Sequence, residues 1–246
     1  TAEELEAAIT PKTKLFMFSS PCNPSGTVYT KEELTAIAKM LEKYPDILII
    51  SDEIYEHVNF TDTHFSIGTI PSMKERTITV NGVSKGFAMT GWRVGFMGAP
   101  LWIAKACNKV QGQITSATCT IAQKAGETAM LAEPKAVTTK MKNTFLSRRD
   151  MMLKALNEIP GIKCNTPKGA FYIFPDVSYY FGKKDGENTI ENANDLCMYL
   201  LNKAHVALVS GTAFGNPECV RISYAAADDK LMEAVKRMKE KLAQLK

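Results

Sequence analysis

Short apolar runs that alternate with a helical pattern restrict the folds open to this chain more than any other feature of its sequence. Residues 15–18, 47–50 and 77–80 are apolar or β-branched, which is typical of buried strands. Thr30 and Glu33 form a capping box that predicts a helix between the first two strands. Because a strand, a helix and a second strand at this spacing form a crossover unit, the sequence predicts an α/β fold with a largely parallel sheet.

Lys85 follows the third predicted strand, after an Asn-Gly turn signal. It therefore lies just past the carboxyl end of a strand, where open α/β sheets bind their ligands. Arg93 comes eight residues later, and Gly86 and Gly91 between them are expected to allow close backbone approach. A lysine and an arginine here suit a ligand with a carbonyl and a phosphate, one bound covalently and the other electrostatically. The alternative is an ordinary surface lysine in a loop.

Distinctive polar side chains follow three of the predicted strand ends, namely Asn23, Asp52 with Tyr55, and Lys85. The carboxyl ends of parallel strands share one edge of a sheet, so residues distant in sequence can converge there. Asparagine and aspartate at a strand end are common turn formers, and each alone would more often be structural. Together with Arg93 they predict a ligand site at that edge.

The chain beyond residue 100 is predicted to be helical at first and then mixed. Residues 101–131 are typical of two helices divided near Ser116, and Pro134 suits the first turn of a long helix that reaches toward Asn157. Further on, strands are expected at 170–174, 206–209 and 220–224, helices from Asn192 and from Asp228, and a surface loop at 182–188. These patterns predict a large α/β domain at 1–132, a connecting helix at 133–158 and a smaller α+β domain at 159–246.

Composition argues against several other classes of protein. The net charge of +4 is mild and no dense Lys/Arg run is present, so no nucleic-acid partner is expected. No apolar run approaches the roughly 18 residues of a membrane span. The six cysteines form no CxxC pair and the three histidines lack metal-ligand spacing, so neither a disulfide framework nor a metal site is expected. Reduced thiols of this kind are typical of a cytoplasmic protein.

Five motifs resemble, in the same order along the chain, those of the class I aminotransferases. The motifs are PCNPSG at 21–26, SDEIY at 51–55, SKGFAMTGWR at 84–93, KGAFY at 168–172 and VRISY at 220–224. Members of that family are pyridoxal-phosphate enzymes of the aspartate aminotransferase fold. The resemblance therefore implies the large cofactor-binding domain of such an enzyme, followed by its small domain.

The resemblance also assigns roles to the polar residues at the predicted strand ends. Lys85 would bind the aldehyde of pyridoxal 5'-phosphate covalently and then act as the base that moves the substrate proton. Asp52 would pair with the pyridine nitrogen, while Tyr55 and Asn23 would hydrogen-bond the phenolic oxygen of the ring. Arg93 would hold the phosphate, because its planar fork matches the oxygens better than an ammonium group does.

For the substrate, the resemblance points to Arg221 in the last predicted strand, with Asn23 beside it. A bidentate guanidinium would grip the α-carboxylate, whereas the plain alternative is a strand arginine in a salt bridge. Tyr172 and Phe214 lie in family motifs near the site, and packing roles are expected for them. One departure concerns Gly82, which stands where many relatives have a phosphate-binding serine.

Family members carry a long segment before the point that matches the start of this sequence. That segment supplies a phosphate-binding turn, an aromatic ring stacked on the cofactor and the groups that choose the substrate side chain. The sequence is therefore expected to be the C-terminal part of a longer protein that is a homodimer at full length. Alone, residues 1–246 are expected to bind the cofactor weakly and to show negligible activity.

The implied reaction is transamination between an amino acid, aspartate or glutamate foremost, and a 2-oxo acid. A β-lyase reaction on the same scaffold is one alternative, and release of ammonia would distinguish it. The aminotransferase-like effector domain of a transcription regulator is another, and such a protein would carry a basic winged-helix domain upstream. A nucleotide-binding dehydrogenase is disfavoured because no G-x-G-x-x-G follows any predicted strand.

Overall fold

The computed structural model describes residues 1–61, 63–131 and 134–246, and the chain divides into two compact units. Unit 1 comprises Thr1–Cys22 and Thr27–Lys142, and unit 2 comprises Asn23–Gly26 and Asn143–Lys246. The expected boundary between the large domain and its connecting helix falls at residues 132 and 133, outside the described residues. That three-part division therefore stays a prediction.

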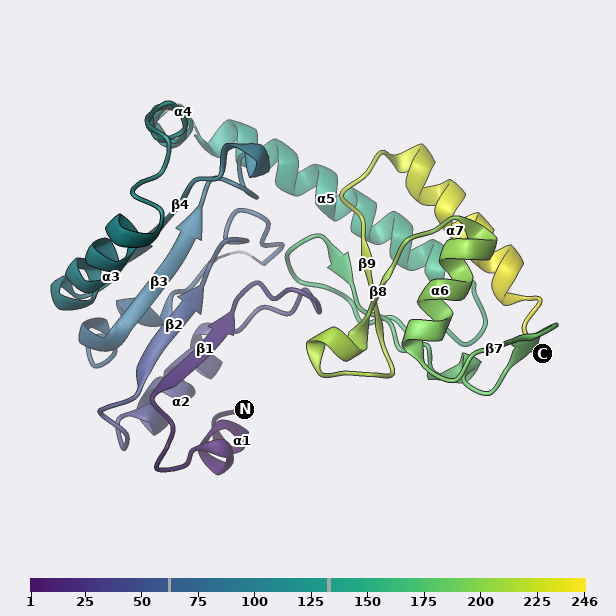
Figure 1. Cartoon of the computed structure of the whole chain (residues 1–246), viewed down its shortest axis with the longest axis horizontal. Helices are drawn as coiled ribbons and strands as arrows, with labels where there is room; N and C mark the ends of the chain where they lie inside the picture. Colours follow the sequence, from purple (N-terminus) through teal and green to yellow (C-terminus); the bar gives the residue numbers. More distant parts are fainter. Residues whose placement is uncertain (62, 132–133) are drawn as a thin grey trace. The chain divides into compact units, whose positions relative to one another are not determined.

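Four strands form the sheet of unit 1, in the order β1 (Leu15–Ser19), β2 (Leu48–Asp52), β3 (Thr77–Gly82) and β4 (Gly95–Gly98). The first three are parallel, and Figure 1 shows their arrowheads pointing in one direction. Strand β4 pairs antiparallel with β3. The connection between them holds only the 3-10 turn η3 (Thr90–Trp92), and a parallel pairing would need a longer crossover. The largely parallel sheet that the sequence predicts is confirmed.

Helix α2 contributes buried apolar side chains to the core of unit 1. The predicted capping box forms, since Glu33 N donates to Thr30 Oγ1 and Thr30 N donates to a Glu33 carboxylate oxygen. Buried side chains of α2 then pack in one apolar cluster with Ile49 of β2 and with Met73. The helices of unit 1 are α1 (Ala2–Ala8), α2 (Lys31–Leu41), α3 (Leu101–Ile114) and α4 (Thr120–Leu131), and its other 3-10 turns are η1 (Ile67–Thr69) and η2 (Lys74–Arg76).

Strand β1 is less buried than its sequence predicts. Phe16 and Phe18 pack against the cluster under α2, but Leu15 and Met17 are exposed, Met17 to 66%. Successive side chains of a strand point to opposite faces, so only alternate residues of this apolar run meet the helix layer. The prediction of a strand is confirmed, and the prediction that the run is buried throughout is wrong.

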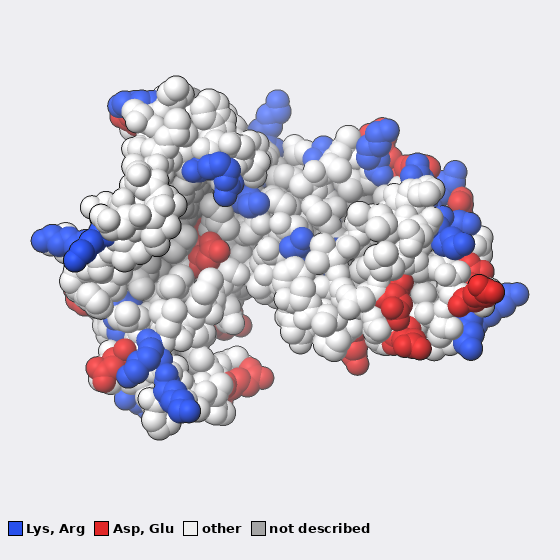
Figure 2. Space-filling model, viewed as in Figure 1, with Lys and Arg blue, Asp and Glu red and all other residues white. Residues whose placement is uncertain are grey.

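The long helix expected from Pro134 is present as α5 (Pro134–Leu156). The division between the two units falls within it, between Lys142 and Asn143. No helix among the described residues is both long and apolar enough to cross a membrane. In the space-filling view, side chains of both signs are interspersed on the visible face, in keeping with the mild net charge of +4 (Figure 2).

Unit 2 is built on a small antiparallel sheet of β5 (Tyr172–Ile173), β9 (Val220–Ser223) and β8 (Val209–Ser210), in that order. Besides the C-terminal part of α5, unit 2 contains the helices α6 (Ala193–Ala204) and α7 (Asp228–Leu242) and the 3-10 turns η4 (Ser178–Tyr180) and η5 (Gly211–Phe214). The predicted apolar stripe of α7 is buried, at Leu231, Val235, Met238 and Leu242.

Two segments of unit 2 differ from their predictions. The strand expected at 206–209 is present only as β8, so residues 206–208 lie outside it. The expected surface loop at residues 182–188 contains a short hairpin instead, formed by β6 (Lys184–Asp185) and β7 (Asn188–Thr189). Gly186 adopts a φ of +58° in the turn between them, a conformation that glycine reaches without a steric penalty. The polar composition of the segment therefore concealed a regular two-residue turn.

Candidate functional site

The parallel strands of unit 1 bring the predicted polar residues to one edge of the sheet. Ser19 at the end of β1 pairs with Asp52 at the end of β2, and Asp52 pairs with Val80 near the end of β3. Lys85 follows three residues after β3 ends. The expectation that Asp52 and Lys85 share the carboxyl edge is thus met by the register of the strands.

The turn that follows β2 holds Tyr55 in place. Ile54 N donates to Asp52 Oδ1 over 3.1 Å, and Val58 N donates to the Tyr55 carbonyl over 2.8 Å. Glu53 N donates to the Val80 carbonyl over 2.9 Å, which ties the turn to β3. Tyr55 is buried, at 4% exposure, so its ring has a fixed position from which to contact a ligand.

Lys85 lies against this ring. Its Nζ is 5.7 Å from the centroid of the Tyr55 ring, within the range of a cation–π contact. The neighbouring Gly86 is needed for this arrangement, because a Cβ there would stand 2.5 Å from His57 Cδ2. The sequence also predicts close backbone approach at Gly91, and this prediction is wrong, because a Cβ there would meet no described atom within 4 Å. Gly91 lies in the 3-10 turn η3, and among the described residues there is open space where its side chain would be.

Arg93 reaches the same edge from the antiparallel strand. Gly95 at the start of β4 pairs with Gly82 at the end of β3, and Val83 N donates to the Val94 carbonyl over 3.4 Å. Arg93 is exposed and adopts a φ of +56°, and its Nη1 donates to the Thr90 carbonyl over 2.8 Å. We call Asp52, Tyr55, Lys85 and Arg93 the edge cluster.

Sequence reasoning missed a buried carboxylate beside the edge cluster. Glu53 is 4% exposed and accepts hydrogen bonds from Ser51 Oγ over 2.9 Å and Ser66 Oγ over 2.6 Å. His64 Nε2 lies 2.8 Å from its other oxygen. Burial raises the pKa of Glu53, but the hydrogen bonds from His64 and Ser66 outweigh burial and hold this pKa below the ordinary value of 4.5. No signal in the sequence could have found this network, because its members come from separate segments.

Within the described residues, Glu53, Glu56 and His64 also form the one group close enough to share a metal ion. The three hydrogen bonds to Glu53 account for its burial without one. Each buried carboxylate oxygen already has donors, which is the usual condition for a charge in a protein interior.

Unit 2 contains the two remaining predicted site residues. Arg221 Nη1 donates to Asn23 Oδ1 over 2.9 Å, although 198 positions separate them in the sequence. The guanidinium carbon lies 4.7 Å from the centroid of the Tyr172 ring and 5.0 Å from that of Phe214. The two rings therefore pack on the arginine and fix the plane of its fork. The packing roles expected for Tyr172 and Phe214 are these contacts.

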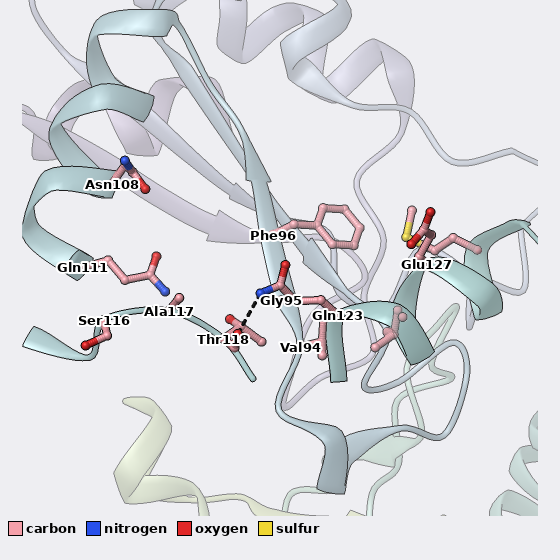
Figure 3. Close-up of a pocket in the computed structure, with 13 residues that line it drawn as sticks. Val94, Gly95, Phe96, Asn108, Gln111, Ser116, Ala117, Thr118, Gln123 and Glu127 are labelled. Carbon is pink, nitrogen blue, oxygen red and sulfur yellow. Dashed lines mark hydrogen bonds between the residues drawn. The ribbon is translucent and has the colours of Figure 1, made fainter. Parts of the chain in front are cut away.

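A separate pocket of 420 Å³ opens in unit 1 between α3, α4 and β4 (Figure 3). Figure 3 shows the Gln123 side chain reaching toward Thr118, and Gln123 Nε2 donates to the Thr118 carbonyl over 2.7 Å. Of the described residues that line this pocket, none belongs to the edge cluster. The pocket is therefore distinct from the site that the sequence predicts.

Comparison with known proteins places these residues in a family. The family model for aminotransferase class I and II matches residues 1–238. The chain is 47% identical to a Petunia hybrida "Bifunctional aspartate aminotransferase and glutamate/aspartate-prephenate aminotransferase", over 98% of this chain and 51% of the relative. It is 43% identical to a Nitrosomonas europaea "Aspartate/prephenate aminotransferase", over 96% of this chain and 60% of the relative.

The fold agrees with these sequence matches. A crystal structure of the aspartate aminotransferase from Rhizobium meliloti superposes with a TM-score of 0.94 at 40% identity, and the match covers 100% of this chain and 62% of that one. The chain thus spans between about half and three-fifths of the length of the relatives it matches. On the family match and the superposition together, the chain belongs to the class I and II aminotransferases.

Proposed function

We propose that the protein transfers an amino group between an amino acid, with aspartate or glutamate preferred, and a 2-oxo acid, with pyridoxal 5'-phosphate as its cofactor. The observation that carries the proposal is the position of the Lys85 amine over the buried Tyr55 ring, at the sheet edge where Asp52 ends β2. The names of the relatives support the substrate class. Two of them also mention prephenate, so prephenate is a further 2-oxo acid to assay.

The donor set of the edge cluster fits this cofactor. An aldehyde requires a primary amine, which Lys85 supplies, and a pyridine nitrogen requires an acid partner, which Asp52 supplies. A phosphate suits an exposed guanidinium such as that of Arg93, and a phenolic oxygen suits the hydroxyl of Tyr55. When bound, the cofactor would supply an electron sink for the carbon that loses its proton.

Residues of this chain would then carry out the steps that depend on protein groups. Lys85 Nζ would accept the proton from the substrate α-carbon and deliver it to the former aldehyde carbon of the cofactor, so one amine serves both attachment and proton transfer. Arg221 would bind the substrate carboxylate through the edge of its fork, and the two rings that pack on it would keep that edge in a single orientation. Asn23 would hold the near side of the fork and contact the bound substrate. At full length, we expect the protein to act as a homodimer.

Replacement of Lys85 tests the proposal. In the full-length protein, Lys85→Ala should lower the rate of aspartate-to-2-oxoglutarate amino transfer by several orders of magnitude, because both the nucleophile and the proton carrier are lost. Lys105→Ala, at an exposed position of α3, is the matched control and should retain full activity.

Chemical labelling gives an independent measure of the same claim. Borohydride reduction of the wild-type protein in the presence of pyridoxal phosphate should fix the label on the peptide that contains Lys85. Label on a different lysine, or unchanged turnover in Lys85→Ala, would contradict the proposed function. Ammonia released without formation of a new amino acid would favour a lyase instead.

A further inference from the structure

The loop Asn23–Gly26 belongs to unit 2, whereas the residues on both sides of it belong to unit 1. Its base is closed within unit 1, where Cys22 N donates to the Thr27 carbonyl over 2.8 Å. Its four residues therefore take their positions from contacts within unit 2.

Three hydrogen bonds seat this loop on residues 165–169. Asn165 Nδ2 donates to the Ser25 carbonyl over 2.7 Å. Lys168 N and Gly169 N both donate to the Gly26 carbonyl, over 2.8 and 2.9 Å. Gly26 is required at this point, since its φ is +67° and a Cβ would stand 2.5 Å from Pro167 Cβ. The loop thus meets residues 165–169 without room for a side chain between them.

Residues 165–169 are themselves anchored to the framework of unit 2. Arg149 of α5 donates from Nη1 to the Pro167 carbonyl over 3.0 Å. Phe174 N, next to β5, donates to Asn165 Oδ1 over 3.4 Å. The amide of Asn165 therefore links Phe174, next to β5, on its acceptor side to the Ser25 carbonyl on its donor side, and so ties the loop to the residue that follows β5.

The position of the Ser25 carbonyl in turn constrains the position of Asn23. Asn23 lies two residues before Ser25 and accepts the hydrogen bond from Arg221 Nη1. Among the described residues this is the hydrogen bond that Arg221 makes, which leaves the rest of its five-donor fork to meet a ligand. A displaced Asn23 would let the guanidinium turn about its stem, and a bidentate carboxylate contact tolerates little rotation.

We propose that Asn165 is a positioning residue for the carboxylate site of Arg221 and Asn23, because its side chain fixes the Ser25 carbonyl and through it the place of Asn23. The inference rests on the proposed function, since it assumes that Arg221 binds a substrate carboxylate. It adds a residue outside the five family-like motifs, and the role proposed for this residue is exerted through Asn23.

The test compares asparagine variants in the full-length protein loaded with pyridoxal phosphate. Asn165→Ala should weaken binding of succinate, a dicarboxylate that cannot react, by about three- to tenfold, the range of one hydrogen bond. Asn165→Asp keeps an acceptor for Phe174 N but faces the Ser25 carbonyl with an oxygen, so it should weaken succinate at least as much. For aspartate, KM should rise by a similar factor while kcat changes less than twofold.

Asn188→Ala is the matched control. Asn188 Nδ2 also donates to a backbone carbonyl in unit 2, that of Asp185 over 3.1 Å, but it lies in the β6–β7 hairpin. Its succinate affinity should equal that of the wild type, and the thermal midpoints of the two alanine variants should agree within about 3 °C.

The outcomes separate this inference from the proposed function. If the wild type binds succinate and Asn165→Ala binds it equally well, the positioning role is overturned and the proposed function stands. Equal weakening in Asn165→Ala and Asn188→Ala would overturn it too, because a general loss of stability would then explain both. If the wild type itself binds no succinate, the carboxylate site and the positioning role fail together.

Discussion

Arg221, which is proposed to bind the substrate carboxylate, can present two parallel N–H donors in one plane, and a lysine at the same place would offer a single point charge. Arg221→Lys in the full-length protein should therefore raise KM for aspartate by about 10- to 100-fold, the value of a charged hydrogen bond. Asp52→Asn should do the opposite and lower kcat more than it raises KM, because Asp52 is proposed to act on the cofactor ring.

Steady-state kinetics of both variants check this division. Arg237→Lys is the control, since Arg237 lies on the exposed side of α7 in a surface pair with Glu233 and should leave both constants unchanged. An unaltered KM in Arg221→Lys would argue against a carboxylate role for this arginine.

Glu53 predicts a dependence of stability on pH. Its folded-state pKa lies below the ordinary value of 4.5, so its contribution is present above that value and is lost as pH falls through the folded-state pKa. At pH 7, Glu53→Gln should lower the free energy of unfolding by about 1–3 kcal/mol, because two hydroxyl donors and His64 lose a charged acceptor.

The difference between Glu53→Gln and the wild type should shrink in denaturant titrations from about pH 5 downward. Glu233→Gln is the control, because Glu233 is exposed and solvent screens its pair with Arg237. A difference that is constant between pH 7 and pH 3 would show that Glu53 contributes through packing and not through its charge.

At the scale of residues, the sequence predicts those site members whose position follows from strand ends. Asp52 and Lys85 need only a parallel sheet to share an edge, and the register supplies it. The Glu53 network could not be foreseen, because His64 and Ser66 arrive from a loop whose path the local sequence does not specify. The prediction of close backbone approach at Gly91 is wrong for the same reason, because such an approach depends on which residues lie opposite the glycine in the fold.

Among the elements, helix α2 allows the contribution of its N-cap to stability to be measured by substitution. Thr30→Ala removes the side chain that accepts from Glu33 N over 3.2 Å, and it should cost about 1 kcal/mol of unfolding free energy. Thr35→Ala is the control within the same helix. Thr35 Oγ1 donates to the Lys31 carbonyl, and alanine is the better helix former, so this change should be neutral or slightly stabilising. Equal losses in the two variants, measured by urea unfolding, would contradict a capping role.

Some helices and strands could be predicted from the sequence pattern, and others could not. Helices α2, α5 and α7 have start signals or apolar stripes, and the structure has them where the sequence predicts them. Strand β1 was found, but which of its faces meets the helix layer depends on the path of the chain. The β6–β7 hairpin was missed because its two-residue strands are too short for any periodicity to appear.

For the whole molecule, exposed apolar side chains on α3 and α4 predict self-association of residues 1–246. Ile114 and Leu131, at the ends of these helices, are 75% and 78% exposed. The double variant Ile114→Ser and Leu131→Ser should lower light scattering and the sedimentation coefficient at high concentration, with little change in thermal midpoint. Ile103→Ala, at a buried position of α3, should instead cost about 2–5 kcal/mol of stability. Unchanged scattering in the double variant would place the cause of association elsewhere.

Unit 2 is unsuitable for inheritance as a separate module, because it includes the loop Asn23–Gly26, which lies within the sequence of unit 1. Recombination that transplanted residues 143–246 into another protein would leave Asn23–Gly26 behind. The new host would receive Arg221 without its amide partner, and the backbone donors of Lys168 and Gly169 without their carbonyl acceptor. Such a transplant would succeed only if a loop of the same shape came from the host, so gene shuffling is expected to move this pair of units as one piece.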